Sequence, residues 1–164
     1  MAKRHAQACP IAAALNVIGD RWSLLIVREA FYGAARFGEF RANTGISKNL
    51  LSARLTLLVE HGVLERIDFA DRGTSHAYQL TDKGRALETV LVAMMQWADA
   101  HIYGDGAAPV AAVDAATGEP IAPLSLIGSD GRAISSRDIA FRAGPGADER
   151  TRKRLADAAA RAAP

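Results

Sequence analysis

The chain holds 164 residues, enough for one well-buried core and a small additional unit, since domains usually hold roughly 100 to 200 residues. Its net charge of +2 is too small to indicate nucleic-acid binding by itself, and its single cysteine excludes an intramolecular disulfide and a zinc site built from several cysteines. No apolar run approaches the roughly 18 residues that cross a bilayer, and Pro10, Asn16 and Asp20 interrupt the mildly apolar N-terminus that a signal peptide would need. We therefore expect a cytoplasmic protein with no membrane partner.

Two helices are predicted at the start of the chain. Proline suits a first helical turn, so Pro10 begins a short helix over residues 10–19 that a glycine ends. The next helix covers residues 20–33, with Asp20 or Ser23 as its N-cap. Its apolar content indicates a central place in the core.

The third predicted helix, residues 36–45, is compact and amphipathic. Phe37 and Phe40 lie three positions apart on one face, and Gly45 ends the helix. From its start to Arg54 the chain carries four cations against one anion, a local basic patch that either a DNA backbone or solvent would accommodate. The cations are Arg36, Arg41, Lys48 and Arg54, and the anion is Glu39.

Residues 45–66, GISKNLLSARLTLLVEHGVLER, predict a helix with polar and cationic residues in its first turn and leucines in its later turns. Ser47 suits the N-cap position. Leu51, Leu55 and Leu58 follow an i, i+4, i+7 pattern that faces the core, so the polar residues lie on the other faces.

A β-hairpin and a longer helix follow Gly62, which is a strong helix stop. Alternating residues on both sides of the turn signal ADRGTS predict the hairpin over residues 63–81, with Arg72 at its tip. Thr81 caps a helix that continues to Tyr103. The apolar surface of this helix is wider than one small core requires, which indicates burial against another subunit.

The composition of the chain changes after the long helix. Residues 104–109 have the composition of a linker, and beyond them short apolar runs are separated by Thr117-Gly118 and Asp130-Gly131, which are turn signals for small antiparallel hairpins. A glycine break then precedes a basic, alanine-rich tail that is helical or frayed. We predict three parts: a domain over residues 1–103, a β-hairpin extension over 104–146 and the tail over 147–164.

The order helix, helix, short helix, turn, helix, hairpin is that of a winged helix-turn-helix, so the fold class is mainly α with a small β-hairpin wing and a C-terminal β-rich extension. A recognition helix presents its first turn to the major groove, where its dipole favours phosphate and polar side chains meet base edges. Asn49 can pair with adenine and Lys48 with guanine, and Arg72 would be the contact from the wing. The full set of candidate DNA-binding residues is Arg36, Ser47, Lys48, Asn49, Ser52, Arg54 and Arg72.

Two other classes of function are open to this pattern. A polar first turn is typical of any capped surface helix, so a winged helix that binds proteins rather than DNA is the alternative. An enzyme is not expected, because the histidines lie in separate elements and the glycine-rich stretches lack a phosphate-loop lysine. The histidines are His5, His61, His76 and His101.

Several motifs together resemble those of the HxlR-type winged helix-turn-helix transcriptional regulators. They are Cys-Pro before the first helix, Gly-Asp-Arg-Trp, Arg-Phe-Gly-Glu-Phe, Gly-Ile-Ser, Leu-Ser-Ala-Arg-Leu, and Tyr-Gln-Leu-Thr with a glycine three residues later, and the similar region spans residues 9–102. The resemblance implies a homodimeric DNA-binding regulator related in architecture to the MarR group. Such a dimer would read an inverted-repeat operator with its recognition helices roughly 34 Å apart. We expect a repressor that an electrophile, an oxidant or a small molecule releases from DNA.

Cys9 is the redox-sensing candidate that the resemblance implies, because some family members use a cysteine at this place to sense electrophiles, quinones or disulfide stress. The dipole of the helix that begins at Pro10 would favour the thiolate. The alternative is a buried small hydrophobe. With one cysteine in the chain, the sensor reactions left are a bridge between the Cys9 residues of two subunits and an adduct with a single thiol.

A small-molecule effector is the other candidate input. Five aromatic residues could line its pocket near the dimer interface, but large apolar residues are more often part of a core, and that is where we expect them. They are Trp22, Phe31, Tyr32, Trp97 and Tyr103.

Residues 109–146 resemble the extension of longer family members, in which a paired Cys-x-x-Cys-Gly pattern suggests a zinc ribbon. Here the corresponding positions read Ala115-Ala116-Thr117-Gly118 and Ser129-Asp130-Gly131. Thiolates are absent, so we expect no metal and no cofactor. The glycines still suit the hairpin turns.

Overall fold

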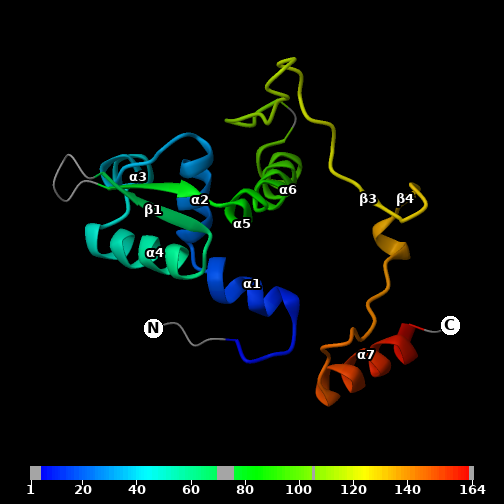
Figure 1. Cartoon of the computed structure of the whole chain (residues 1–164). Helices are drawn as coiled ribbons and strands as arrows, with labels where there is room; N and C mark the ends of the chain where they lie inside the picture. Colours follow the sequence, from blue (N-terminus) through cyan, green and yellow to red (C-terminus); the bar gives the residue numbers. More distant parts are fainter. Residues whose placement is uncertain (1–4, 70–75, 105, 163–164) are drawn as a thin grey trace. The chain divides into compact units, whose positions relative to one another are not determined.

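The computed structural model describes residues 5–69, 76–104 and 106–162 (Figure 1). The chain forms two compact units, one of Val17–Pro123 and one that joins the chain up to Asn16 with the chain from Leu124 onward. The elements up to the hairpin are α1 (Pro10–Ile18), α2 (Ser23–Phe31), α3 (Phe37–Thr44), α4 (Lys48–Glu60), β1 (Leu64–Asp68) and β2 (His76–Leu80). The later elements are α5 (Asp82–Arg85), α6 (Glu88–Ala98), a π-helical turn (Asp99–Tyr103), β3 (Leu126–Ile127), β4 (Ala133–Ile134), a 3-10 turn (Ser136–Asp138) and α7 (Glu149–Ala162).

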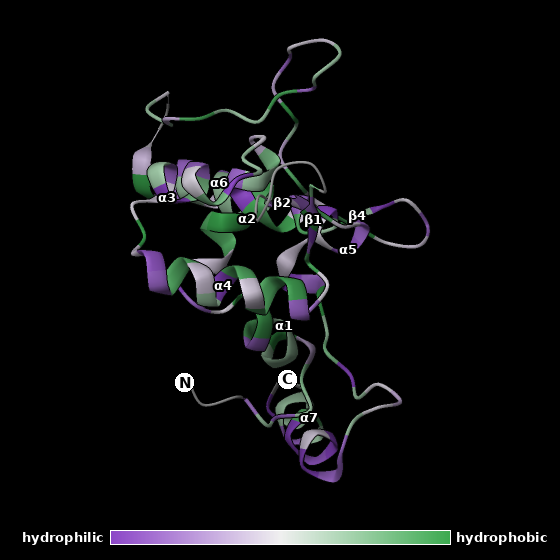
Figure 2. Cartoon of the chain, turned by 60° about the vertical axis from the view of Figure 1, so that its left-hand side comes forward, coloured by the Kyte–Doolittle hydropathy of each residue, from purple (hydrophilic) through white to green (hydrophobic). Residues whose placement is uncertain are grey.

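The buried core lies in the larger unit, where α2, α3, α4 and the β1–β2 hairpin pack together. Apolar residues at helical spacing turn one face of each helix inward, and Figure 2 shows apolar and polar positions alternating along α4. Removing these side chains from water is the main term that stabilises the unit. Among the largest fully buried side chains are Phe40, Ile26, Ile46, Leu51, Leu55, Leu58 and Leu64.

The predicted wing is present as the antiparallel pair β1–β2, whose register sets Leu64 opposite Leu80. Both leucines are buried, which fixes the register because a slip by one residue would turn them to solvent. The backbone N–H of Tyr78 also donates to the carbonyl of Ala35 at 2.7 Å, so the hairpin is attached to the loop before α3. Arg72, predicted at the tip, lies outside the described residues.

Glycines end α3 and α4 where the sequence predicted it. Gly45 and Gly62 adopt left-handed conformations, with φ of 69° and 65°. After α4, Gly62 N–H donates to the carbonyl of Val59 at 2.9 Å and Val63 N–H to that of Leu58 at 2.8 Å, which is a Schellman motif. This motif directs the chain from α4 into β1.

The helix predicted from Thr81 to Tyr103 is divided into three parts, so the prediction of one continuous helix was wrong. The hydroxyl of Thr81 caps the first part as predicted, because it accepts a hydrogen bond from Gly84 N–H at 3.1 Å. α5 ends after four residues, α6 follows a turn, and a π-helical turn of five residues runs to Gly104. A Cβ on Gly84 would lie 2.1 Å from the carbonyl oxygen of Val63, so glycine lets α5 press against the end of the hairpin. The apolar residues keep a helical spacing through the turn between α5 and α6. The sequence pattern therefore predicted one continuous helix.

The two turns predicted in the extension are present. Gly118 and Gly131 adopt φ of 74° and 80°. The first turn connects Val113 to Pro120, which pair in an isolated antiparallel β-bridge. The second turn connects β3 to β4. The first lies in the larger unit and the second in the smaller one, while the domain boundaries predicted from sequence stay a prediction.

The tail predicted as helical or frayed forms the helix α7. Within the described ranges, no single helix is long and apolar enough to cross a bilayer, and α1 and α2 pass that test only together, as a bent pair.

Candidate nucleic-acid interface

The first turn of α4 presents polar groups to solvent. Ser47 occupies the N-cap position as predicted, with extended φ and ψ of −65° and 147°, but among the described residues its hydroxyl makes no capping hydrogen bond. The side chains of Lys48, Asn49 and Ser52 are also exposed. The first backbone N–H groups of a helix have no partner within the helix, and the dipole gives this end a positive character. Donors from backbone and side chains therefore gather at one end of α4.

The opposite face of α4 is fully buried. Leu51, Leu55 and Leu58 are each 0% exposed, which confirms the predicted leucine pattern. Each of these leucines packs in the cluster that also holds α2, α3 and the hairpin. The buried leucines hold α4 in place, so the exposed first turn is carried by a rigid helix.

Arg54 of α4 is less exposed than the polar residues of the first turn, and its guanidinium lies beside Asp20. Its side chain is 27% exposed, and its Nε atom lies 3.2 Å from Oδ1 of Asp20, an ion-pair distance without the alignment of a hydrogen bond. The same carboxylate accepts hydrogen bonds from the N–H groups of Trp22 and Ser23 at 2.9 and 3.2 Å. Trp22 is the N-cap residue of α2, so the prediction of Asp20 or Ser23 at that position was wrong, although Asp20 still binds the first N–H groups of the helix. Arg54 thus ties α4 to the start of α2. The contact with a DNA backbone predicted for Arg54 stays a prediction.

Arg36 stands at the N-terminus of α3, with its guanidinium 5.2 Å from the ring centre of Phe69, the residue after β1. Glu39 accepts hydrogen bonds from the N–H groups of Ala35 and Arg36, both at 2.8 Å. These bonds hold the pKa of the Glu39 carboxyl below its usual value. Arg36 is thereby placed beside the base of the wing, while Arg72 at the tip lies outside the described residues.

The sequence analysis missed a polar network that joins the two helices before α4. Glu29 of α2 is only 5% exposed. Its Oε1 accepts a hydrogen bond from Arg28 Nε at 3.0 Å, and its Oε2 accepts one from Asn43 Nδ2 on α3 at 2.8 Å. A buried carboxylate needs such partners, so the network fixes how α2 and α3 cross. The sequence contained one indication of this network, because Glu29 is an acidic residue in a predicted helix that is otherwise mostly apolar.

Cys9 lies at the N-terminal end of α1 and is half-buried. Hydrogen bonds from the backbone N–H groups of Ala12 and Ile11, and more weakly the charge of Arg154 on α7, hold the pKa of its thiol below the usual value. The helix terminus acts as predicted, and the cation from α7 is an addition that the sequence pattern did not show.

The aromatic residues considered for an effector pocket divide into two groups. Trp22 and Phe31 are partly buried and pack against the core, as expected. Tyr32, Trp97 and Tyr103 are 56%, 60% and 50% exposed, so the expectation that they belong to the core was wrong. Within the residues that could be searched, no three His, Cys, Asp or Glu side chains gather as metal ligands would.

The fold and the exposed first turn of α4 define a winged helix-turn-helix protein. The family model described as HxlR-like helix-turn-helix matches residues 17–105, more than half of the chain, and the chain belongs to this family of transcriptional regulators. It is 37% identical over 136 residues to Rv3095 of Mycobacterium tuberculosis, an uncharacterised HTH-type transcriptional regulator, and the match covers 83% of this chain and 86% of that one.

Solved structures show the same fold. PA1607, described as a candidate transcription factor, is 43% identical with a TM-score of 0.76, and the match covers 85% of this chain and 96% of that one. The redox regulator HypR in its oxidised form is 31% identical with a TM-score of 0.51, over 55% of this chain and 94% of HypR. The similarity to PA1607 thus extends beyond the region that the family model matches.

Proposed function

We propose that the chain is a sequence-specific DNA-binding regulator that acts as a homodimer on an inverted-repeat operator in the cytoplasm. The observation that carries the proposal is the division of α4 into a fully buried leucine face and an exposed first turn with polar side chains. A helix held in this way can enter the major groove without loss of core packing.

Each candidate residue has a stated role in this proposal. Lys48 and Asn49 contact base edges, with guanine and adenine as their preferred partners. Ser47 and the first backbone N–H groups of α4 bind phosphate, as helix N-termini do. Ser52, one turn further along α4, lies within reach of the same groove. Arg36, Arg54 and Arg72 would add contacts to the backbone.

The homodimer is proposed from α6, which leaves one row of apolar side chains exposed among the described residues. Val90, Met94 and Trp97 follow an i, i+4, i+7 pattern and are 41%, 51% and 60% exposed. One contiguous apolar helix face of this kind is typical of an interface between subunits. A second copy of the chain would bury it and bring two α4 helices to one operator.

Cys9 is the proposed input to a repressor that an electrophile or an oxidant releases. The lowered pKa of its thiol raises the thiolate fraction, and the thiolate is the nucleophile. The similarity to the redox regulator HypR supports this choice. Cys9→Ser should abolish the loss of DNA binding on treatment with diamide or a quinone, and a full response of this variant would remove Cys9 from the proposal.

A winged helix that binds proteins instead of DNA is the second candidate, since the exposed face of α6 suits any apolar partner. Selection of bound genomic fragments separates the two. The proposal predicts enrichment of an inverted repeat, and binding of the enriched fragment that weakens steeply with salt. Selection without enrichment of any fragment would favour the protein-binding candidate.

The contact residues are tested on the enriched fragment by gel shift. Lys48→Ala and Asn49→Ala should each weaken binding about tenfold, because a good base contact contributes about 1–3 kcal/mol. Both variants should keep the mass of the unaltered protein in gel filtration, since neither side chain lies on α6. Unchanged affinity of both variants would contradict the assignment of α4.

A further inference from the structure

The smaller unit contains a groove that the proposed DNA-binding surface does not use. It lies between the segment around Cys9 and the segment from Phe141 into α7, and its volume is about 880 Å³. This is within the range of roughly 300–1,000 Å³ that is usual for small-molecule sites. We call it the terminal groove. The lining residues that matter here are Cys9, Ile11, Phe141, Arg142, Arg154 and Leu155.

Apolar side chains line the groove without being covered. Ile11 and Phe141 are 69% and 77% exposed, although both face a concave surface. Leu155 from α7 adds a half-buried side chain. Removing apolar surface from water is favourable, so a ligand with an apolar body would be stabilised here.

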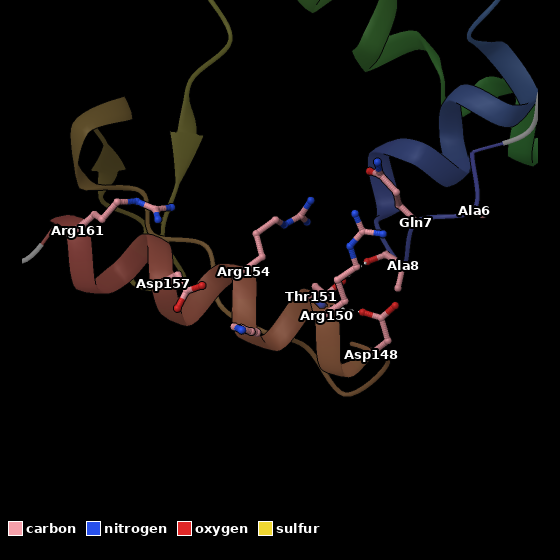
Figure 3. A pocket seen from close by; sticks show the side chains of 10 residues that line it. Ala6, Gln7, Ala8, Asp148, Arg150, Thr151, Arg154, Asp157 and Arg161 are labelled. Carbon is pink, nitrogen blue, oxygen red and sulfur yellow. Dashed lines mark hydrogen bonds between the residues drawn. The ribbon is translucent and has the colours of Figure 1, made fainter.

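Two guanidinium groups give the groove a positive charge. Arg142 and Arg154 line it, and neither is paired with a carboxylate among the described residues. Figure 3 shows the side chain of Arg154 extending from α7 on the side where Gln7 and Ala8 lie. An unpaired guanidinium favours a planar carboxylate, with which it can form two parallel hydrogen bonds.

The nearby carboxylates line a neighbouring hollow rather than the groove. Asp148 and Asp157 share that hollow with Arg154, as seen in Figure 3, but among the described residues no ion pair joins either of them to Arg154. Asp148 is also engaged at the start of α7, where its Oδ1 accepts a hydrogen bond from Thr151 N–H at 2.7 Å. The cations of the groove therefore remain available to an anion.

We propose that the terminal groove binds an amphiphilic monocarboxylate, a small molecule with an apolar body and a single carboxylate. Arg142 and Arg154 bind the carboxylate, and Ile11, Phe141 and Leu155 cover the apolar body. The ligand then lies beside the thiol of Cys9. A consequence for transcription rests on the proposed function, whereas binding itself is measured without DNA, so the two can fail separately.

Decanoate is a suitable probe, and calorimetry with the full chain is a suitable measurement. The proposal predicts saturable binding of decanoate that Arg154→Gln weakens about tenfold or more, since a hydrogen bond between charged groups contributes about 1.5–3 kcal/mol. Arg152→Gln is the matched control, because Arg152 lies on the same helix but does not line the groove. Decanol, which lacks the charge, should bind more weakly and should not respond to Arg154→Gln.

Two results would overturn the proposal. One is the absence of saturable decanoate binding to the full chain, which is also expected if a second copy of the chain fills the groove. The other is binding that Arg154→Gln and Arg152→Gln alter equally, or that decanol matches. Circular dichroism of each variant confirms that α7 and the core are folded.

The thiol supplies an independent readout. Bound decanoate should slow the alkylation of Cys9 by iodoacetamide, because the ligand lies over the thiol, and Phe141→Ala should reduce this protection by weakening the cover of the apolar body. Alkylation at an unchanged rate in saturating decanoate would place the ligand elsewhere and contradict the proposal.

Discussion

The region from α2 to β2 buries most of its large apolar side chains, whereas the region from Val110 to Phe141 leaves most of its own exposed. In the first, Leu51, Leu55 and Leu58 are 0% exposed. In the second, Ile134 and Ile139 are half-buried, and the other large apolar side chains are 41% to 77% exposed. The difference follows from the elements. Helices and five-residue strands present whole apolar faces to one another, but β3 and β4 have two residues each, and a short hairpin alone buries too little surface to be stable.

Composition and burial are therefore separate properties. The exposed apolar residues between Val110 and Phe141 are of the same types as those of the core, so burial follows from the elements that carry them. Under the two proposals above, a small ligand would cover Phe141, and a second subunit would cover the exposed residues of α6, which lies outside this region.

Leu55→Ala should lower the free energy of unfolding by about 2–5 kcal/mol, because it removes a fully buried side chain and leaves a cavity. Leu126→Ala, at a position 58% exposed, should change it by less than about 0.5 kcal/mol. Urea unfolding monitored by circular dichroism measures both. Equal losses would show that the two regions do not differ as described.

Gly84→Ala should lower the free energy of unfolding by about 1–3 kcal/mol, since its Cβ would meet the carbonyl oxygen of Val63 at 2.1 Å and the backbone must move. Gly38 of α3 is the matched control, because a Cβ there has no neighbour within 4 Å. Gly38→Ala should be neutral or stabilising by up to about 1 kcal/mol. A neutral Gly84→Ala would contradict the close packing of α5 on the hairpin.

Trp97→Ala should raise the dissociation constant of the proposed dimer by about tenfold or more, because an aromatic residue at the centre of an apolar face often dominates an interface. Glu88→Gln, on the opposite face of α6 by helical geometry, should leave it unchanged. Sedimentation equilibrium at several protein concentrations gives both constants. A dimer that Trp97→Ala does not weaken would have to form through another surface.

The smallest expected effect concerns Cys9. Because the pKa of its thiol is lowered, the thiolate is present at lower pH than in an ordinary cysteine, and the pH profile of alkylation should have its midpoint below that of a free thiol. Arg154→Gln should move this midpoint slightly upward, since the cation is the weakest of the lowering causes. A midpoint at or above that of a free thiol would contradict the placement of Cys9 at the helix terminus.

Local patterns in the sequence predicted most of the core. The leucine spacing of α4, the stops at Gly45 and Gly62 and the cap at Thr81 each follow from the chemistry of a few neighbouring residues, and the structure confirms them. The tertiary partners of polar residues could not be predicted in this way. Whether Arg54 meets solvent or Asp20 depends on how α4 crosses α2, which no local pattern states.

The candidate site shows the same limit. The polar first turn of α4 could be predicted because capping and the helix dipole are local effects. Ser47 occupies the predicted N-cap position, although among the described residues its side chain makes no capping hydrogen bond. Glu29 with its partner Asn43, and Arg154 beside Cys9, join residues 14 and 145 positions apart in the chain. Contacts of that kind appear only once the chain is folded.

Binding of DNA by the first turn of α4 is tested by the salt dependence of operator binding, measured by fluorescence anisotropy. Lys48→Ala should lower the affinity about tenfold, and if Lys48 also neutralises a phosphate the slope of log K against log salt should fall by about 0.9. Arg85→Ala is the control, because it removes a charge from α5, which packs near the other end of α4. A loss of affinity is expected for Lys48→Ala alone. Identical binding curves for the two variants would contradict it.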